Sequence, residues 1–407
     1  MNWKVSRAFT TIGSGTTPKS DDASYYDDGT INWLITGDVN DGEIKNIDRK
    51  ITAKALSDYS ALHIYPVGSI VITMYGAIGK IGMLTEPSTV NQACCVLVPG
   101  KNVFPKYALH YFLATRHQLI ELGVGGVQSN VSQDIIKSLR ISLPSVEMQR
   151  NIALYLDRKV SIIDKIIAAK NHTHTHLLEL RQAIITDAVL GRGGVGVNYR
   201  QTNIPWIGKI PAHWQVRRIK DMADISVGWT PDTNNPDYFN GNNTWVTIAD
   251  MNQKYIVSSK VKISNEAIDS SRIKLVKKGS LLYSFKLSVG KVAFAGKDLY
   301  TNEAIAAITP NYNDEVDTIF LYYAISTYLA NNANENIYGA KIMNQDTIRN
   351  SYVAFPDINE QLKISRTLDK KVRNIDNAVS INKQSIQLLN EYKSSLISNV
   401  INGKVKV

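Results

Sequence analysis

Three histidines near the middle of the sequence are candidates for metal chemistry. His172, His174 and His176 alternate with threonine, and the outer two would share a helix face, where two imidazoles can bind a metal ion. The chain contains a second, similar part, in which the matching residues are Gln384, Ile386 and Leu388. A function shared by both parts cannot require the histidines, so a solvated or partner-facing stretch is the favoured interpretation.

Two further patterns resemble nucleotide-binding or base-binding motifs. Gly191, Gly193 and Gly196 satisfy the letters G-x-G-x-x-G, but they follow an expected helix, whereas dinucleotide binding requires a strand before the glycines. Residues 235–238 read Asn-Pro-Asp-Tyr and resemble the Asn-Pro-Pro-Tyr motif of adenine methyltransferases. They depart at the third position, and no glycine-rich cofactor loop accompanies them. We interpret both patterns as linker or turn.

The remaining sequence gives no catalytic signature. Cys94 and Cys95 are adjacent, so they cannot build an ordinary disulfide framework or complete a zinc site, and we expect them to be small strand residues. The sequence has no phosphate-binding loop, nucleophile elbow or His-Glu-x-x-His motif. It therefore predicts a protein that is not an enzyme and that binds no metal.

The charge balance favours a polyanionic partner. The formal net charge is +10 and the isoelectric point about 9.3, and a basic surface attracts nucleic acid first. Each candidate phosphate contact has a solvated surface charge as its alternative. The candidates are Lys19, Lys80, Arg217, Arg218 and Lys291.

Length and composition indicate ordinary folded domains. The 407 residues suffice for two or three domains, and 44% apolar with 20% charged residues is typical of globular protein. The first residues lack a signal peptide's apolar core, and no stretch of 18 apolar residues follows. We expect a cytoplasmic protein without membrane contact.

An internal repeat covers most of the chain. Gly15-Thr-Thr-Pro18 recurs as Gly228-Trp-Thr-Pro231, and Asn91-Gln-Ala93 recurs as Asn302-Glu-Ala304, at offsets of 213 and 211. Fourteen positions from Gln133 to Gly191, among them Gln149 and Asp157, recur as the same residue 212 positions later. Two homologous halves should fold alike, with a pseudo-two-fold or screw relation between them.

Each half divides into a mixed domain and a long helix. Short β-rich runs such as 69–75 and 280–285, with turns and one helical stretch, predict α/β or α+β domains at residues 1–144 and 205–356. The pattern after Pro144 and Pro356 is helical, which gives helices at 145–191 and 357–403. Residues 192–204 form the linker.

The second helix carries clear start, stop and packing signals. Asp357 and Glu360 form a capping-box signature, and Gly403 suits the C′ position. Apolar residues from Leu368 to Leu389 fall at three- and four-residue steps, with polar Asn382 in one core slot. A helix of this length must bury its stripe. The favoured partner is its own repeat, giving an antiparallel pair between the domains; the alternative is packing on its own domain.

The order of these motifs resembles the specificity subunits of type I restriction-modification systems. The resemblance covers essentially the whole chain and includes the two Thr-Pro turns, residues 206–214 (Trp-Ile-Gly-Lys-Ile-Pro-Ala-His-Trp), and the Leu-Pro and Phe-Pro pairs before the helices. One departure is that the first half starts at Trp3 without the Ile-Pro-x-x-Trp lead-in that ends at Trp214.

The resemblance implies a division of labour. Each α/β domain would be a target recognition domain that reads one half of a split, asymmetric site on double-stranded DNA. The helices would act as spacer and as docking surface for two methylation (M) subunits, which restriction (R) subunits join. S-adenosylmethionine, ATP and Mg would be used on those partners, with no cofactor in this chain.

The family does not fix the DNA contacts by motif, so the expected site combines the repeated turns with the basic candidates. Lys80 and Lys291, in the Gly-Lys turns, belong to both sets. The further residues expected at the site are Thr17, Thr230, Gln128 and Lys341.

Two rival interpretations stay open at this stage. One is a duplicated coiled-coil scaffold without DNA specificity, whose positive charge is incidental. The other is a self-sufficient methyltransferase that uses residues 235–238. Salt-dependent duplex binding separates the first from DNA recognition, and stoichiometric binding of S-adenosylmethionine by the isolated chain identifies the second.

Overall fold

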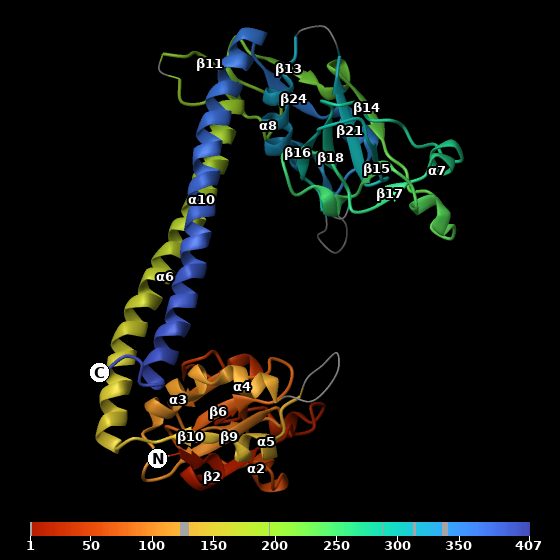
Figure 1. Ribbon diagram of the computed structural model, residues 1–407. Coiled ribbons are helices and arrows are strands. Elements are labelled where there is room, and N and C mark those ends of the chain that lie inside the picture. The colour runs from red at the N-terminus through yellow and green to blue at the C-terminus, as the bar shows by residue number, and fades with distance from the viewer. Residues whose placement is uncertain (1, 123–129, 195, 287, 312–314, 336–340) are drawn as a thin grey trace. The chain divides into compact units, whose positions relative to one another are not determined.

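The computed structural model describes residues 2–122, 130–194, 196–286, 288–311, 315–335 and 341–407 (Figure 1). The chain forms two compact units. Unit 1 comprises Met1–His172 with Lys383–Val407, and unit 2 comprises Thr173–Asn382. Each α/β domain therefore shares a unit with parts of both long helices, so the packing groups the chain differently from the domain ranges read along the sequence.

A five-stranded sheet forms the centre of unit 1. Its order is β2 (Phe9–Ser14), β9 (Cys94–Pro99), β6 (Ile70–Thr73), β7 (Ile81–Leu84) and β4 (Glu43–Ile44), antiparallel except for β4 beside β7. Ile70 and Ile72 face a large core with the helices, while Val71 faces a smaller core on the other side. Burial on both faces explains the continuous apolar run that predicted this strand.

The adjacent cysteines occupy β9 and point to opposite cores of the sheet. Both thiols are free and buried. Burial raises the pKa of each thiol to about 12, which keeps both protonated at neutral pH. Their predicted role as small strand residues is confirmed.

Smaller elements surround this sheet. Three-stranded sheet β5 (Lys50–Ile51), β3 (Ile31–Leu34), β8 (Thr89–Val90) packs with α2 (Ala53–Asp58), and β1 (Asn2–Lys4) pairs with β10 (Arg140–Ser142). The other elements are η1 (Ala23–Tyr25), η2 (Thr36–Asp38), α1 (Val5–Ala8), α3 (Pro105–Ala114), α4 (Arg116–Glu121) and α5 (Gln133–Ser138).

Unit 2 repeats the central sheet, the three-stranded sheet and the terminal strand pair of unit 1. Its central sheet has the order β14 (Ala223–Val227), β21 (Ile305–Pro310), β18 (Leu281–Ser284), β19 (Val292–Ala295), β16 (Tyr255–Ile256). The three-stranded sheet is β17 (Lys262–Ile263), β15 (Asn243–Val246), β20 (Tyr300–Thr301), and β13 (Gln215–Arg218) pairs with β24 (Tyr352–Phe355). Since the strands have the same neighbours in both units, the predicted duplication and mixed α/β class are confirmed.

The remaining elements of unit 2 complete the comparison. Helices α7 (Asn265–Asp269), α8 (Thr318–Tyr328) and α9 (Gln345–Asn350) correspond to α2, α3 and α5. Two hairpins lie in the lead-in and before α9: β11 (Tyr199–Gln201) with β12 (Lys209–Pro211), and β22 (Asn334–Glu335) with β23 (Lys341–Ile342). The short helices are η3 (Ile219–Asp221), η4 (Pro236–Phe239), η5 (Ile248–Asp250) and η6 (Leu329–Asn332).

The two long helices are α6 (Val146–Val189) and α10 (Ile358–Ile401). The Asp357 carboxylate accepts the N–H of Glu360 at 3.0 Å, as the capping signature predicts. Gly191 and Gly403 follow the helices with φ of 63° and 71°, the left-handed conformation expected at C′. No helix within the described residues has an apolar stretch long enough to cross a membrane.

Both predicted ways of burying the helices occur together. In unit 1 the first part of α6 shares a core with the last part of α10, and Asp164 pairs with Lys393 at 2.8 Å. In unit 2 Arg181 on the last part of α6 pairs with Asp376 on α10 at 2.7 Å. Since the first part of one helix meets the last part of the other, the helices run antiparallel. The same helix segments also pack on the α/β domain of their unit.

Candidate nucleic-acid interface

The repeated Thr-Pro turn follows the first strand of each central sheet. Thr17 donates its hydroxyl hydrogen to Oε1 of Gln92 at 2.7 Å, and Tyr75 donates to the carbonyl oxygen of Gln92 at 2.5 Å. The indole N–H of Trp33 also donates to the carbonyl of Thr16 at 3.2 Å. These bonds hold the turn beside the β6–β7 hairpin loop.

Unit 2 builds the same turn with different side chains. Thr230 donates to the carboxylate of Glu303, and the indole N–H of Trp245 donates to the carbonyl of Trp229 at 3.1 Å. Trp229 itself is 47% exposed. The backbone frame is thus shared, whereas an amide in one unit is replaced by a carboxylate in the other.

The two Gly-Lys turns close the equivalent hairpins β6–β7 and β18–β19. The backbone N–H of Lys80 donates to Oγ1 of Thr73, and that of Lys291 donates to Oγ of Ser284, each at 2.9 Å. Gly79 precedes Lys80 with a φ of 73°, a conformation that favours glycine. The Nζ of Lys291 donates to the Ile248 carbonyl at 3.2 Å.

The other predicted contacts have varied surroundings. Lys19 is exposed and lies 3.6 Å from Asp21. Lys341 lies in β23, and Gln128 lies outside the described residues.

The two arginines already have partners within the chain. Arg217 pairs with Glu315 at 2.9 Å, and Arg218 stacks over the Tyr352 ring and donates to its hydroxyl. They lie on the β13–β24 pair rather than at the turns of the central sheet. In unit 1, Gln92 links the Thr-Pro turn to the loop of the β6–β7 hairpin. In unit 2, Lys291 lines a hollow beside α10. The arginines lie apart from the turns of both central sheets.

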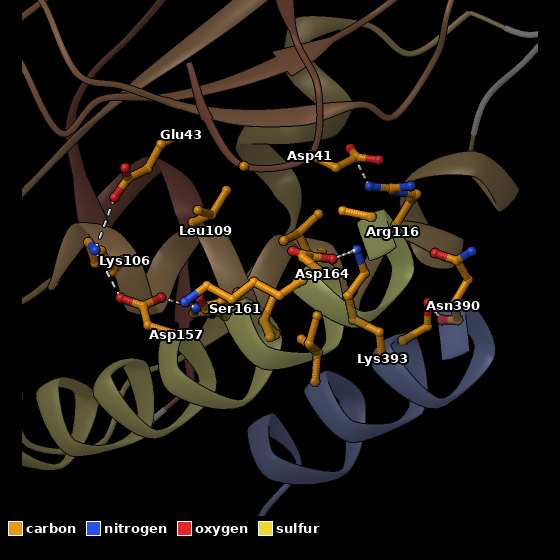
Figure 2. Close-up of a pocket in the computed structure, with 18 of the residues that line it drawn as sticks. Asp41, Glu43, Lys106, Leu109, Arg116, Asp157, Ser161, Asp164, Asn390 and Lys393 are labelled. Atoms are coloured by element: carbon orange, nitrogen blue, oxygen red, sulfur yellow. Dashed lines mark hydrogen bonds and ion pairs between the residues drawn. The ribbon is translucent and has the colours of Figure 1, made fainter. Parts of the chain in front are cut away.

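Two equivalent hollows lie where the α/β domains meet the long helices. The hollow of unit 1, of about 990 Å³, is bounded by the β4 segment, α3, α6 and α10 (Figure 2). The hollow of unit 2 is about 580 Å³. Repeat-related residues line both: Glu43 and Tyr255, His110 and Tyr323, Asp157 and Asp369, Asp164 and Asp376.

A helix carboxylate anchors the domain in each hollow. Asp157 accepts from Lys106 and from Nε2 of His110, both at 2.9 Å, and Lys106 also reaches Glu43 at 3.0 Å (Figure 2). Sequence reasoning identified Asp157 as a recurring position but did not identify its partners.

In unit 2, Asp369 accepts from Lys254 at 2.7 Å and from the Tyr323 hydroxyl at 2.6 Å. The two lysines do not correspond in the repeat, because Lys106 comes from α3 and Lys254 precedes β16. The carboxylate is repeated, and so is the position of its second partner, which is His110 in unit 1 and Tyr323 in unit 2.

Ion pairing determines what the first hollow can do chemically. Arg116 pairs with Asp41, and Lys393 pairs with Asp164, in addition to the cluster at Asp157. Cations and carboxylates therefore neutralise one another, so the hollow holds helix and domain together and does not form a strong anion site. The turns and hairpins remain the better candidates for contacting DNA.

The anchoring carboxylates predict acid sensitivity. Burial raises the pKa of Asp157, but hydrogen bonds from His110 and Lys106 lower this pKa by more. Burial also raises the pKa of Asp369, and hydrogen bonds from Lys254 and Tyr323 lower it by more. A carboxyl whose pKa is lower in the native state than in the unfolded state stabilises the fold when it is ionised. This stabilisation is complete above the unfolded-state pKa of about 4, and it is lost as the pH falls through the native pKa.

We therefore expect the Tm to fall steeply below about pH 4. The double variant Asp157→Asn, Asp369→Asn should be less stable at neutral pH and show a flatter acid limb. Thermal unfolding followed between about pH 3 and pH 7 measures both effects. Parallel acid limbs for the variant and the natural chain would contradict this role.

The motif-like patterns adopt the ordinary structures that were favoured for them. Asn235 accepts the N–H of Asp237 at 3.2 Å at the start of the short helix η4, so residues 235–238 form a turn. Gly191 and the following glycines come after α6. His176 contacts Glu179 at 3.0 Å on the same helix. Across the described part of the chain, no three His, Cys, Asp or Glu side chains gather as a metal site.

Comparison with known proteins agrees with this duplicated architecture. The sequence profile of the type I restriction modification DNA specificity domain matches residues 3–173 and again 211–391. The match covers most of the chain and one segment in each repeat. The chain belongs to this family.

Individual relatives are distant. The MjaIX specificity subunit of Methanocaldococcus jannaschii is 29% identical over 47% of this chain, and the matched part spans 45% of that subunit. The EcoBI specificity subunit of Escherichia coli is 21% identical over 84% of this chain and 74% of its own length. A chain solved in a study of type I R-M complex assembly superposes with a TM-score of 0.77 at 15% identity, covering 100% of this chain and 98% of that one. This last likeness concerns the fold.

Proposed function

We propose that this chain is the DNA-recognition subunit of a type I restriction-modification complex and reads a bipartite, asymmetric site on double-stranded DNA. The observation that carries the proposal is the repeated frame with altered side chains. Thr17 and Thr230 hold equivalent turns, but one contacts Gln92 and the other Glu303. Two equivalent domains with different surfaces suit a site whose halves differ in sequence.

The proposal assigns catalysis to partner subunits. Two methylation subunits would transfer methyl groups from S-adenosylmethionine to adenine, and restriction subunits would use ATP and Mg for cleavage. This chain would supply sequence recognition and, through α6 and α10, a spacer. Helices of 44 residues extend about 66 Å. Paired recognition modules bind half-sites that lie one helical turn of DNA, about 34–36 Å, or a multiple of it apart, and this length is close to two turns.

The Gly-Lys hairpins provide a direct test. Lys80→Gln and Lys291→Gln should each weaken duplex binding similarly for all sequences, because lysine neutralises phosphate without reading bases. Each should reduce the slope of log K against log salt by about 1. Fluorescence anisotropy titrations of the complex with methylation subunits, at several salt concentrations, measure both quantities.

The matched control is Lys277→Gln. Lys277 is an exposed lysine that pairs with Asp298 at 3.0 Å. It precedes β18 and its partner follows β19, so neither belongs to the turn between these strands. It should leave the slope unchanged. Equal slopes for all three variants and the natural chain would remove the hairpins from the interface. Absence of any salt-dependent duplex binding would refute DNA recognition and favour the scaffold alternative.

A further inference from the structure

An apolar hollow of about 510 Å³ lies in unit 1, where the start of α6 meets the end of α10. It is separate from the hollow of Figure 2 and from the turns assigned to DNA. Its walls are mainly apolar side chains, and Tyr107 directs its hydroxyl to the Ser142 carbonyl at 2.8 Å. The residues that the argument uses are Tyr107, Pro144, Met148, Ile152, Val400 and Gly403.

The equivalent place in unit 2 is filled by the segment Pro211–Trp214. Trp214 is only 1% exposed and packs edge-on against Phe320, with ring centroids 6.1 Å apart. His213 bonds to Glu360 on α10 at 2.9 Å. A Cβ on Gly191 would lie 2.5 Å from the Pro211 ring and 3.0 Å from the Trp214 ring, so this glycine permits the close approach.

The repeat shows that the hollow of unit 1 and the place filled by Pro211–Trp214 in unit 2 are two copies of one binding surface, which we call the seat. Three residues contact the segment in unit 2, namely Phe320, Glu360 and Gly191. Their repeat counterparts are Tyr107, Met148 and Gly403, and all three line the hollow of unit 1. The residues of unit 1 that the structure describes contain no Pro-x-x-Trp sequence, and the last residues of the chain line the hollow without filling it.

We propose that this seat in unit 1 binds an extended segment of a partner protein that carries proline followed three residues later by tryptophan. The seat in unit 2 shows the geometry that such a segment adopts. In unit 1 the position of Glu360, which bonds to His213 in unit 2, is taken by Met148, which is 43% exposed. The residue before the tryptophan in the partner segment is therefore apolar rather than histidine. Lys406 lines the hollow and Lys404 is exposed nearby in sequence, which favours acidic flanks on the partner segment. The proposal stands independently of DNA recognition.

The probe is a labelled peptide with the sequence of residues 204–214, in which the residue matching His213 is leucine. We expect saturable binding to the full chain, measured by fluorescence anisotropy. Met148→Arg should weaken binding at least about tenfold, since it places a charge at the rim of an apolar seat. Leu154→Arg alters an exposed apolar residue of the same helix that does not line the hollow, and it should leave binding unchanged.

A second variant tests occupancy without removing any side chain from the seat. Attaching residues 198–214 directly before Met1 should fill the hollow and abolish peptide binding, because Asn2 pairs with Ser142 as Val216 pairs with Ala354, so Met1 then takes the place of Gln215. A peptide in which the tryptophan is alanine should bind to none of the proteins. The proposal is overturned by absence of saturable binding, by equal affinity for the natural chain and Met148→Arg, or by undiminished binding to the extended chain.

Discussion

A chain whose residues 205–356 are replaced by the matching segment of a relative is expected to recognise a site changed in one half only. The structure supports this expectation because the segment contains both strands of the β13–β24 pair and every strand of the sheet centred on β18. Of its described strands, β12 is the one that pairs outside the segment, with β11. Its attachment to α10 combines a shared apolar core, which includes Leu368 and Val372, with hydrogen bonds such as those of Asp369 with Lys254 and Tyr323. A graft that retains these partners should be held in the same place.

The expected effect on binding is large. Each mismatched base pair costs about 1–3 kcal/mol, so two mismatches in the altered half should weaken binding to the old site by roughly 30-fold to 20,000-fold. Sequencing of methylated adenines in cells that carry the natural or the exchanged gene reports both half-sites directly. Changes in both halves, or in neither, would refute independent reading by the two domains.

Replacing Gln361 by alanine is expected to destabilise unit 2 by about 3 kcal/mol or more. The Gln361 side chain is 1% exposed and donates to the carbonyls of Glu315 and Pro356 at 3.0 and 2.9 Å. Its oxygen accepts the N–H of Asp317, at the start of α8, at 2.8 Å. Alanine would leave three backbone groups without this partner and create a cavity at the base of α10.

Urea unfolding followed by tryptophan fluorescence and by circular dichroism tests this prediction. The control is Gln387→Ala on the same helix, since Gln387 is exposed and bonds only to Glu391 among the interactions seen for it. We expect less than about 0.5 kcal/mol for the control. Equal midpoints for the two variants would show that the buried glutamine does not stabilise the junction.

The sequence predicted the features that depend on local pattern. The repeat, the buried central strands, the long helices, and their ends at Asp357 and Gly403 follow from spacing, apolar periodicity and capping chemistry. The structure confirms each of these elements. Such signals lie within a few residues of one another, or recur at one offset, so they can be read without knowledge of tertiary contacts.

Tertiary partnerships were not predictable in the same way. Gln149 was recognised as a recurring residue, yet nothing in the sequence shows that it joins Asn102, Phe104 and Pro144. The lysine that pairs with the helix carboxylate, Asp157 or Asp369, comes from α3 in unit 1 and from the segment before β16 in unit 2. Because the two lysines are at unrelated positions, comparing the repeats does not identify them.

The positive charge of the chain also predicted the DNA contacts incompletely. Arg217 and Arg218 were selected as phosphate contacts from their charge, whereas the structure pairs one with Glu315 and stacks the other on Tyr352. Both partners lie about 100 residues or more away in the chain, and no local signal links them. The turn residues could be selected because they recur, which is evidence of a shared frame rather than of shared contacts.

The glutamine contacts have a consequence for how such genes change. Gln149 and Gln361 make the same three bonds to the α/β domains of their respective units, and both domains end at a proline that precedes the helix. A crossover that joins a domain ending at Pro144 to α10, or one ending at Pro356 to α6, would therefore meet a junction that already fits that domain. New recognition specificities can then arise by shuffling within a single gene, without new mutations at the junction.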